Sequence, residues 1–356
     1  MMVSQFFNFL FFLVYAIIIN MKSKRINLVK YRKAVLPTAR LNRVKKFDVV
    51  TIGGATRDIM FYSGEGELVS TGNLTKQKLL AFEYGAKILA DKLYFSYGGG
   101  AANTAVSFSR LGLKTGVICK LGNDDNGKEV IKNFRARKVD TSLIKIDKKA
   151  KTGFSMILTV NSIAKEHVLF AYRGANNLLI DNDLSLSKIM TDWYYIPSLP
   201  ERGWENIIRA VIRQKAKIAW NPGGSQLATI NKVKIYLPKI NLLILNKDEA
   251  LEFRKLKNIK GLIKYIHSLG PKIVVITDGE KGAYVYDGQK YYYMKVLTTS
   301  SVDTVGVGDA FASAFTSAII YDKNIKLALK WGITNSASVV GKVGAQNGLL
   351  SLRQLK

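Results

Sequence analysis

The sequence predicts an α/β fold in which a mainly parallel sheet is covered by helices on both faces. Short and almost wholly apolar segments recur along the chain, as expected of strands buried on both sides of a parallel sheet. Helix-like segments separate most of them, and this alternation is typical of layered α/β proteins. We expect strands at residues 48–52, 117–119, 218–220, 242–245 and 273–276, helices at 101–111, 127–138, 204–214 and 310–320, and a β-hairpin at 283–296.

A second, smaller sheet is predicted from alternating apolar and polar residues. This pattern occupies residues 80–88, and residues 154–160 and 167–172 are strand-like on either side of a polar turn. Alternation indicates strands that expose one face to solvent. We therefore expect a small β lid outside the main layers, with its strands near residues 59–97 and 152–175.

Residues 1–46 form an N-terminal extension, and we expect the folded domain at residues 47–350. Residues 6–19 are an apolar run interrupted only by Asn8, shorter than the roughly 20 residues that a membrane-spanning helix needs. No basic region precedes this run and no small-residue cleavage site follows it, which argues against a secretory signal. Either the run anchors the protein, with the basic residues behind it keeping the domain cytoplasmic, or the natural chain begins at Met21. Both alternatives place the domain in the cytoplasm.

Composition excludes several classes of protein. The net charge is +28, and the extension carries ten of these positive charges without an acidic residue, which leaves +18 on the remainder. Such an excess favours polyanions. The lysines are scattered, however, without a basic stripe interleaved with aromatic residues, so we expect no specific nucleic-acid site. Cys119, the only cysteine, cannot form an intrachain disulfide, and the distant His167 and His267 exclude a His/Cys metal cluster.

The most specific feature is a glycine turn in front of a predicted helix, at residues 303–309, Asp-Thr-Val-Gly-Val-Gly-Asp. Free amides at a helix start, reinforced by the helix dipole, form an anion site. Beside such a site, Asp309 could accept a proton from an attacking hydroxyl while the amides stabilise a transferring phosphoryl group. An Asp that only caps the helix would give the same pattern, so spacing alone leaves both interpretations open.

A second glycine turn lies about two hundred residues upstream, at residues 98–103, Gly-Gly-Gly-Ala-Ala-Asn. Small residues let a ligand approach the backbone, and Asn103 offers both a donor and an acceptor to a hydroxyl group. A tight strand-to-helix turn would require similar glycines. The triplet alone is therefore weak evidence for a site.

Taken together, the two turns resemble the two signatures of the pfkB, or ribokinase-like, family of carbohydrate and nucleoside kinases. The signatures are G-G-x-x-x-N and D-T-x-G-A-G-D, and the chain departs from the second only at Val307. The resemblance covers about residues 47–346 and implies a three-layer α/β/α sandwich with a small β lid. It implies Asp309 as the catalytic base, with the anion hole formed by the amides of Gly306, Val307, Gly308 and Asp309 itself.

The same resemblance assigns substrate contacts. These are Asp58, Gly98, Gly99, Asn103 and Arg173, although Arg173 could instead be an exposed lid residue. Ribose-specific members of the family tend to have Lys where this chain has Gly100, which counts against a strict ribokinase.

Residues behind other predicted strands resemble the family's nucleotide elements. Residues 246–249, Asn-Lys-Asp-Glu, resemble an N-x-x-E element that could hold hydrated Mg²⁺ through Asn246 and Glu249, although the same pattern would cap a helix. A K⁺ site near Asp303 is implied as well. The implied nucleotide contacts are Asn221, Asn246, Thr277, Gly279, Gly282 and Asn335, with helix packing as the alternative for Asn335.

We therefore predict an ATP-dependent kinase for a small sugar. Asp58 and Asn103 would orient the substrate, Asp309 would take the hydroxyl proton, and lid closure would exclude water. A nucleoside kinase with the same machinery is one alternative. A non-catalytic basic protein associated with membranes or nucleic acid is another. We also expect a homodimer.

Overall fold

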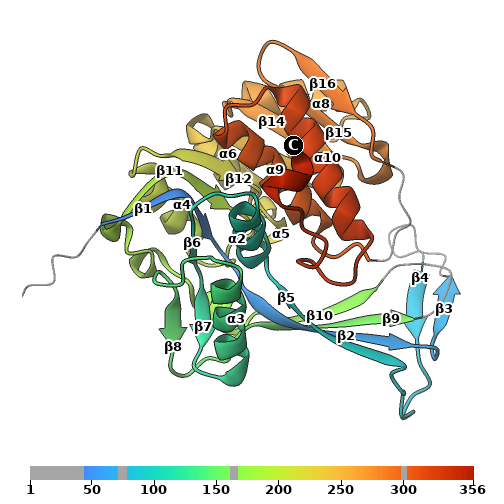
Figure 1. Cartoon of the computed structure of the whole chain (residues 1–356). Helices are drawn as coiled ribbons and strands as arrows, with labels where there is room; N and C mark the ends of the chain where they lie inside the picture. Colours follow the sequence, from blue (N-terminus) through green and yellow to red (C-terminus); the bar gives the residue numbers. More distant parts are fainter. Residues whose placement is uncertain (1–43, 71–77, 161–166, 298–302) are drawn as a thin grey trace, which may run out of the picture. The chain divides into compact units, whose positions relative to one another are not determined.

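The computed structural model describes residues 44–70, 78–160, 167–297 and 303–356, and Val44–Lys356 form one compact unit (Figure 1). The predicted apolar run and its membrane association lie outside these residues. Within the described ranges, no helix combines the length and the apolar character that a membrane crossing requires.

A sheet of eight strands lies at the centre of the described chain, in the order β16-β15-β14-β13-β12-β11-β1-β6. The strands from β14 to β6 are parallel, and the hairpin β15–β16 continues the sheet in antiparallel pairing. All five apolar segments expected as strands lie in this sheet, and the expected hairpin forms its edge. The strands are β1 (Lys45–Ile52), β6 (Thr115–Ile118), β11 (Ile189–Ile196), β12 (Lys217–Trp220), β13 (Leu242–Asn246), β14 (Ile273–Thr277), β15 (Ala283–Tyr286) and β16 (Tyr291–Met294).

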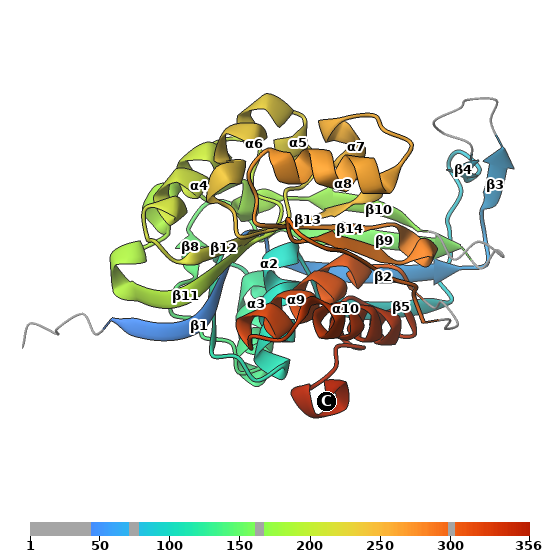
Figure 2. The same ribbon diagram turned by 90° about the horizontal axis from the view of Figure 1, so that it is seen from above.

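Helices cover both faces of this sheet (Figure 2). Consecutive strand residues enter different cores: Tyr194 packs into the core beneath α4–α8, and Tyr195 into the core beneath α2, α9 and α10. The predicted three-layer α/β/α arrangement is thus confirmed. The helices are α2 (Gly100–Arg110), α3 (Asp125–Ala136), α4 (Trp204–Ile212), α5 (Gly224–Leu227), α6 (Ile230–Tyr236), α7 (Lys247–Phe253), α8 (Ile259–Ser268), α9 (Val307–Ile320), α10 (Ile325–Val340) and α11 (Leu352–Leu355), with short 3₁₀ turns η2 (Gly174–Leu178), η3 (Asp181–Asp183), η4 (Leu186–Lys188), η5 (Leu237–Lys239) and η6 (Gly279–Lys281).

The lid is a separate sheet with the strand order β10-β9-β2-β5. The segments expected at 154–160 and 167–172 are its strands β9 and β10, and every residue of β10 is exposed. A hairpin of β3 and β4 lies at the outer end of the lid (Figure 1). The strands are β2 (Thr56–Ser63), β3 (Glu67–Ser70), β4 (Lys78–Ala81), β5 (Lys92–Gly98), β9 (Phe154–Val160) and β10 (Val168–Tyr172).

The strand expected at residues 80–88 is wrong for most of its length. Strand β4 ends at Ala81, and a turn follows in which the Ala86 amide donates to the Glu83 carbonyl over 3.2 Å. Gly85 has φ +83°, a conformation that interrupts a strand. Tyr84 is fully exposed, so the alternating apolar side chains of this segment do not mark a buried face.

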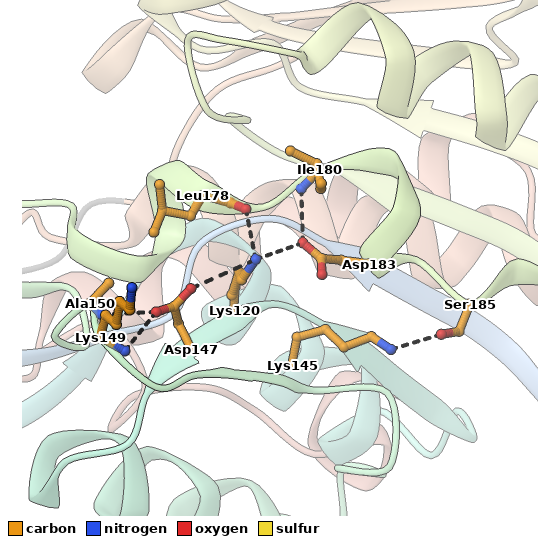
Figure 3. Close-up of polar contacts among 9 residues, drawn as sticks. All are labelled: Lys120, Lys145, Asp147, Lys149, Ala150, Leu178, Ile180, Asp183 and Ser185. Carbon is orange, nitrogen blue, oxygen red and sulfur yellow. Dashed lines mark hydrogen bonds and ion pairs between the residues drawn. The ribbon is translucent and has the colours of Figure 1, made fainter.

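The root of the lid is held by an ionic cluster around Lys120, the first residue of β7 (Lys120–Gly122) (Figure 3). The Lys120 ammonium lies 3.1 Å from the Asp183 carboxylate and 3.9 Å from the Asp147 carboxylate, and it donates to the Leu178 carbonyl over 3.0 Å. Asp147, at the end of β8 (Lys145–Asp147), precedes the lid strand β9, whereas Leu178 and Asp183 follow β10. This Lys120 cluster therefore joins the segments on both sides of the β9–β10 hairpin.

Candidate functional site

The starts of two helices meet in the interior of the molecule. Strand β5 leads directly into α2, and the predicted glycine turn at 303–309 leads into α9. The two helices pack closely because their contact faces carry small residues: the Ser313 hydroxyl on α9 donates to the Ser107 hydroxyl on α2 over 2.7 Å. Their first turns, and the two signature motifs, consequently lie side by side.

Asn103 and Asp309 are in direct contact. The Asn103 amide nitrogen donates to Oδ2 of Asp309 over 2.8 Å, although 206 positions separate the two residues. A Cβ added at Gly100 would lie 3.6 Å from Oδ1 of Asp309 but only 2.7 Å from Pro197. A longer side chain at position 100 thus has no room in this arrangement.

The first turn of α9 has the features of an anion site. No side chain caps the helix at Gly306, which has φ +76° and could not carry a side chain because Ala345 occupies the space. The first amides of a helix have no intrahelical acceptor. Apart from its chain neighbours and its own helix, no atom of the described residues lies within 4 Å of where a Cβ of Gly308 would stand, so a ligand can approach the backbone there. An anionic phosphoryl group fits these uncapped donors.

The Asp309 carboxyl has the proton affinity of a base that works near neutral pH. Burial raises the pKa of Asp309 to about 6, against the opposing effect of the hydrogen bond from Asn103. The side chain is surrounded by protein atoms, yet part of its surface stays open to solvent. A carboxylate with this pKa is ionised at pH 7 and still takes up a proton readily.

Asp58 lies on β2 between Ser96 of β5 and Ser155 of β9, and its side chain is buried. Burial raises the pKa of Asp58, opposed by hydrogen bonds from Thr56 and Ser155. A Cβ at Gly98 would collide with the Asp58 carboxylate. The chain therefore needs glycine at 98 for Asp58 to occupy this position.

The other two residues expected at the substrate side differ in environment. Gly99 is the N-cap of α2, with φ +88°. Arg173 is exposed and immediately precedes η2. Three residues later, Asn176 accepts from the Ala55 amide over 3.1 Å and donates to the Ala55 carbonyl over 2.9 Å. Sequence reasoning missed this Asn176 link, which ties the end of the lid to the turn before β2.

Five of the six expected nucleotide residues lie at or behind the carboxyl ends of three neighbouring strands. Asn221 directly follows β12, and its side-chain nitrogen donates to the backbone carbonyl of Ile244 on β13 over 2.9 Å. Thr277, at the end of β14, is paired in register with Asn246. Gly279 is the first residue of η6, the turn that follows β14, and Gly282 follows its last residue. In a parallel α/β sheet, ligands bind at this edge.

Asn246 and Glu249 cap α7. The Asn246 side chain accepts from the Glu249 amide over 2.8 Å, and the Glu249 carboxylate accepts from the Asn246 amide over 2.9 Å. Burial raises the pKa of Glu249, and the negative charge of Asp309 raises it further. Among the described residues, no group of three or more His, Cys, Asp or Glu could hold a metal ion. This sparse set of oxygen donors fits a hydrated Mg²⁺, which retains several waters.

Asn335 is inaccessible to a ligand in this structure. Its amide nitrogen donates to the Ala310 carbonyl over 2.8 Å, and its oxygen accepts from the Leu350 amide over 2.8 Å. The side chain is completely buried. Asn335 joins α10 to α9 and to the C-terminal segment. This is the role in helix packing that the sequence left as an alternative.

Two residues that the sequence did not single out stand behind Asn103. The Gln346 amide nitrogen donates to Oδ1 of Asn103 over 3.1 Å, and the Asn133 amide nitrogen donates to Oε1 of Gln346 over 3.0 Å. Asn133 lies on α3, and Gln346 lies in the turn after α10. We call Asn133, Gln346 and Asn103 the amide chain. Neither Asn133 nor Gln346 belongs to a motif that the sequence indicated.

Comparisons with known proteins agree with this architecture. A family model described as pfkB family carbohydrate kinase matches residues 66–352. The ribokinase of Haemophilus influenzae is 25% identical over 295 residues, covering 79% of this chain and 94% of its own. The 5-dehydro-2-deoxygluconokinase of Bacillus licheniformis is 25% identical over 335 residues, covering 88% and 96%. The structure of Arabidopsis thaliana ribokinase complexed with ribose and ATP matches with a TM-score of 0.69 at 19% identity, covering 87% of this chain and 98% of that one. The ribokinase-like fold is thus confirmed.

Proposed function

Because the chain belongs to the pfkB family of carbohydrate kinases, we propose that it transfers the γ-phosphoryl group of ATP to a hydroxyl of a small sugar. The observation that carries this proposal is the 2.8 Å contact between Asn103 and Asp309, beside the uncapped start of α9. An amide suited to holding a hydroxyl touches a carboxylate suited to deprotonating it. The names of the relatives, ribokinase and 5-dehydro-2-deoxygluconokinase, support a sugar as acceptor.

In the proposed reaction, Asp58 and Asn103 orient the acceptor and the turn at Gly98 and Gly99 lets it approach the backbone. The sugar hydroxyl forms the new bond to the γ-phosphorus, and the bond from that phosphorus to the bridging oxygen of ATP breaks. The hydroxyl proton passes to Asp309. Arg173, which is exposed beside the lid, would reach the substrate from that side.

The phosphate side of the proposal rests on backbone donors. The amides of Gly306, Val307, Gly308 and Asp309 would hold oxygens of the transferring group, since donors fixed in advance stabilise charge that develops in the transition state. The nucleotide would lie along the strand ends, against Asn221, Asn246, Thr277, Gly279 and Gly282. Asn335 would support this site only by holding α9 in place.

Mg²⁺ would be held by Asn246 and Glu249 together with waters and would supply positive charge opposite the phosphate oxygens. K⁺ near Asp303 stays a prediction from the family resemblance. Both carboxylate oxygens of Asp303 already accept backbone hydrogen bonds, from Val305 over 3.0 Å and from Gly344 over 2.8 Å. These bonds hold the glycine turn against the loop that contains Gln346.

An acceptor screen tests the proposal. The purified protein is given ATP and Mg²⁺ with ribose, fructose, ketodeoxy sugar acids or nucleosides, one at a time, and the release of ADP is measured. We expect a sugar to accelerate ADP release and EDTA to abolish the acceleration. A response to nucleosides alone would identify a nucleoside kinase. No response to any acceptor, together with salt-sensitive binding to DNA or anionic vesicles, would favour the non-catalytic alternative.

A further inference from the structure

The geometry points to a directional chain of amide hydrogen bonds that orients Asn103 toward Asp309, with Gln346 and Asn133 as positioning residues. The inference rests on the proposed function, because it specifies how the base is held. Three bonds form the chain: Asn133 to Gln346 over 3.0 Å, Gln346 to Asn103 over 3.1 Å, and Asn103 to Asp309 over 2.8 Å. Each bond joins residues more than 200 positions apart in the sequence.

The direction of the chain is set at its Asp309 end. An ionised carboxylate only accepts hydrogen bonds, whereas an amide side chain has one donor end and one acceptor end. Asp309 therefore requires the nitrogen of Asn103, which turns the Asn103 oxygen toward Gln346. Gln346 must therefore donate its nitrogen to the Asn103 oxygen, and its own oxygen then accepts from Asn133. The orientation of each amide thus follows from the charge on the carboxylate.

Burial enforces this order. The exposed fractions of Asn103, Gln346 and Asn133 are 4%, 3% and 8%. Little water can reach these side chains, so a reversed amide would oppose two oxygens or leave a donor unpaired, and either is costly in the interior. The three residues come from α2, the turn after α10, and α3, so the chain also fixes these segments relative to one another.

The chain also assigns the two oxygens of Asp309. Oδ2 is engaged by Asn103, whereas Oδ1 accepts no hydrogen bond from the described residues and lies 3.6 Å from where a Cβ of Gly100 would stand. Oδ1 is then the oxygen that takes the hydroxyl proton. Because the Asn103 oxygen is held by Gln346, Asn103 has only its second N–H for the acceptor. Asn103 therefore donates a hydrogen bond to an oxygen of the substrate.

Other titratable groups near Asp309 would not produce this directional effect. Tyr195 on β11 and Glu249 on α7 both interact electrostatically with Asp309. Neither forms a hydrogen bond with a member of the amide chain. Burial raises the pKa of Tyr195, so its phenol is uncharged between pH 4 and 8. The negative charge of Glu249 favours the protonated form of Asp309, opposite to the hydrogen bond from Asn103. The amide chain is therefore the feature whose reversal changes the base most directly.

The variant Gln346→Glu tests the chain by replacing a donor with an acceptor of similar size. When the new carboxylate at position 346 is ionised it can only accept, so Asn103 turns its nitrogen toward residue 346 and its oxygen toward Asp309, which favours the protonated form of Asp309. We expect the acid limb of the kcat–pH profile to move upward by about one pH unit. The matched control is Asn347→Asp, which adds the same charge at the next, exposed residue outside the chain. We expect this control to leave the limb in place, because solvent screens its charge.

A second measurement does not depend on catalysis. The thermal unfolding temperature is recorded between pH 4 and 8 for the wild type, Gln346→Glu, Asp309→Asn, and Asp309→Asn with Gln346→Glu. The protein loses stability as the pH rises through the pKa of folded Asp309. If that pKa is higher, the loss continues to a higher pH. We expect Gln346→Glu to show this extension when Asp309 is present and to lose it in the double variant, which has no carboxyl group at position 309. An inactive wild type would overturn the proposed function, while these curves still test the chain.

Two outcomes would overturn the inference. One is a folded Gln346→Glu protein whose acid limb and unfolding curves match the wild type. The other is an equal shift in Asn347→Asp, because this would reduce the effect to added charge. If Gln346→Glu does not fold, Gln346→Met replaces it. Loss of the chain should then lower kcat about tenfold with an unchanged KM for ATP, and an unchanged kcat would overturn the chain.

Discussion

The amide chain and the Lys120 cluster are both polar networks that cross between segments, but they differ in charge and direction. The amide chain consists of neutral side chains and ends on one carboxylate, Asp309. The Lys120 cluster places one ammonium between two carboxylates and a carbonyl (Figure 3). An ammonium has three equivalent donors, so it imposes no orientation on its partners, whereas an amide does. The first network should therefore control proton affinity, and the second only the placement of the lid.

The largest expected effect comes from removing the carboxylate at which the amide chain ends. We expect Asp309→Asn to lower kcat by about 10³-fold, because the hydroxyl loses its proton acceptor. ATP binding should change little. The same variant should raise the unfolding temperature by about 2–4 °C at pH 7.5, since a partly buried charge disappears. Steady-state kinetics, calorimetric ATP titration and thermal melting measure the three quantities.

The control for this variant is Asp192→Asn, which neutralises an exposed carboxylate on β11. It should leave kcat and the unfolding temperature unchanged. A kcat for Asp309→Asn within tenfold of the wild type would remove Asp309 as the base. A lower unfolding temperature would show that its charge stabilises the folded protein.

The second effect concerns Gly98, which lies against the other buried carboxylate of the site. In Gly98→Ala the new methyl group would collide with the Asp58 carboxylate. Displacement of Asp58 should lower kcat/KM for the acceptor about 100-fold, mainly through KM, because small errors in position are costly. The pH at which the acid limb falls should not change, since the amide chain is intact.

Gly261→Ala on α8 is the matched control for Gly98→Ala. In the described part of the chain, nothing outside its own helix and chain neighbours lies within 4 Å of where its Cβ would stand. Replacing glycine inside a helix should raise the free energy of unfolding by about 0.5–1 kcal/mol without affecting kinetics. An unchanged acceptor KM in Gly98→Ala would show that Asp58 does not hold the substrate.

The third effect is the pH dependence of the wild type. With the pKa of Asp309 at about 6, kcat/KM should fall tenfold for each pH unit below about 6 as the base becomes protonated. Stability responds in the opposite direction. The folded pKa exceeds the ordinary value of 3.8, so this contribution to stability is full below 3.8 and is lost as pH rises through about 6. An acid limb below pH 5 would contradict the assignment of Asp309.

The sequence predicted the layered fold and the residues of both signatures because these depend on local patterns. Apolar runs identified the five strands, and glycine turns before helices identified the regions of Asn103 and Asp309. The strand at 80–88 was wrong because alternation reports exposure but not whether a partner strand is available. Tyr84 stands at an apolar position of the alternating pattern, yet its side chain is exposed to solvent.

The networks behind the site could not be predicted in the same way. Gln346 and Asn133 are 213 positions apart. No local sequence pattern predicts which residue a buried side-chain amide will bind. Lys120, Asp147 and Asp183 are similarly dispersed among many scattered charges. For Asn246 and Glu249, the sequence was compatible with both a helix cap and a metal site. Their reciprocal hydrogen bonds show the cap, and Mg²⁺ binding remains a proposal.

The smallest effect is expected in the Lys120 cluster. Lys120→Met keeps most of the side-chain volume but leaves two carboxylates without their ammonium, and the Lys120 side chain is only 15% exposed. The free energy of unfolding should fall by about 2 kcal/mol, and the acceptor KM should rise about two- to fivefold because the lid is placed less well.

The acid limb is the quantity that separates this cluster from the amide chain. Lys120→Met should leave it at the wild-type pH, whereas Gln346→Glu should move it. Lys132→Ala is the surface control: its pair with Glu129 spans 3.4 Å between largely exposed side chains, so its removal should cost less than about 0.5 kcal/mol. If Lys120→Met moves the acid limb as far as Gln346→Glu does, the two networks are coupled through the lid. The division between proton control and lid placement would then be wrong.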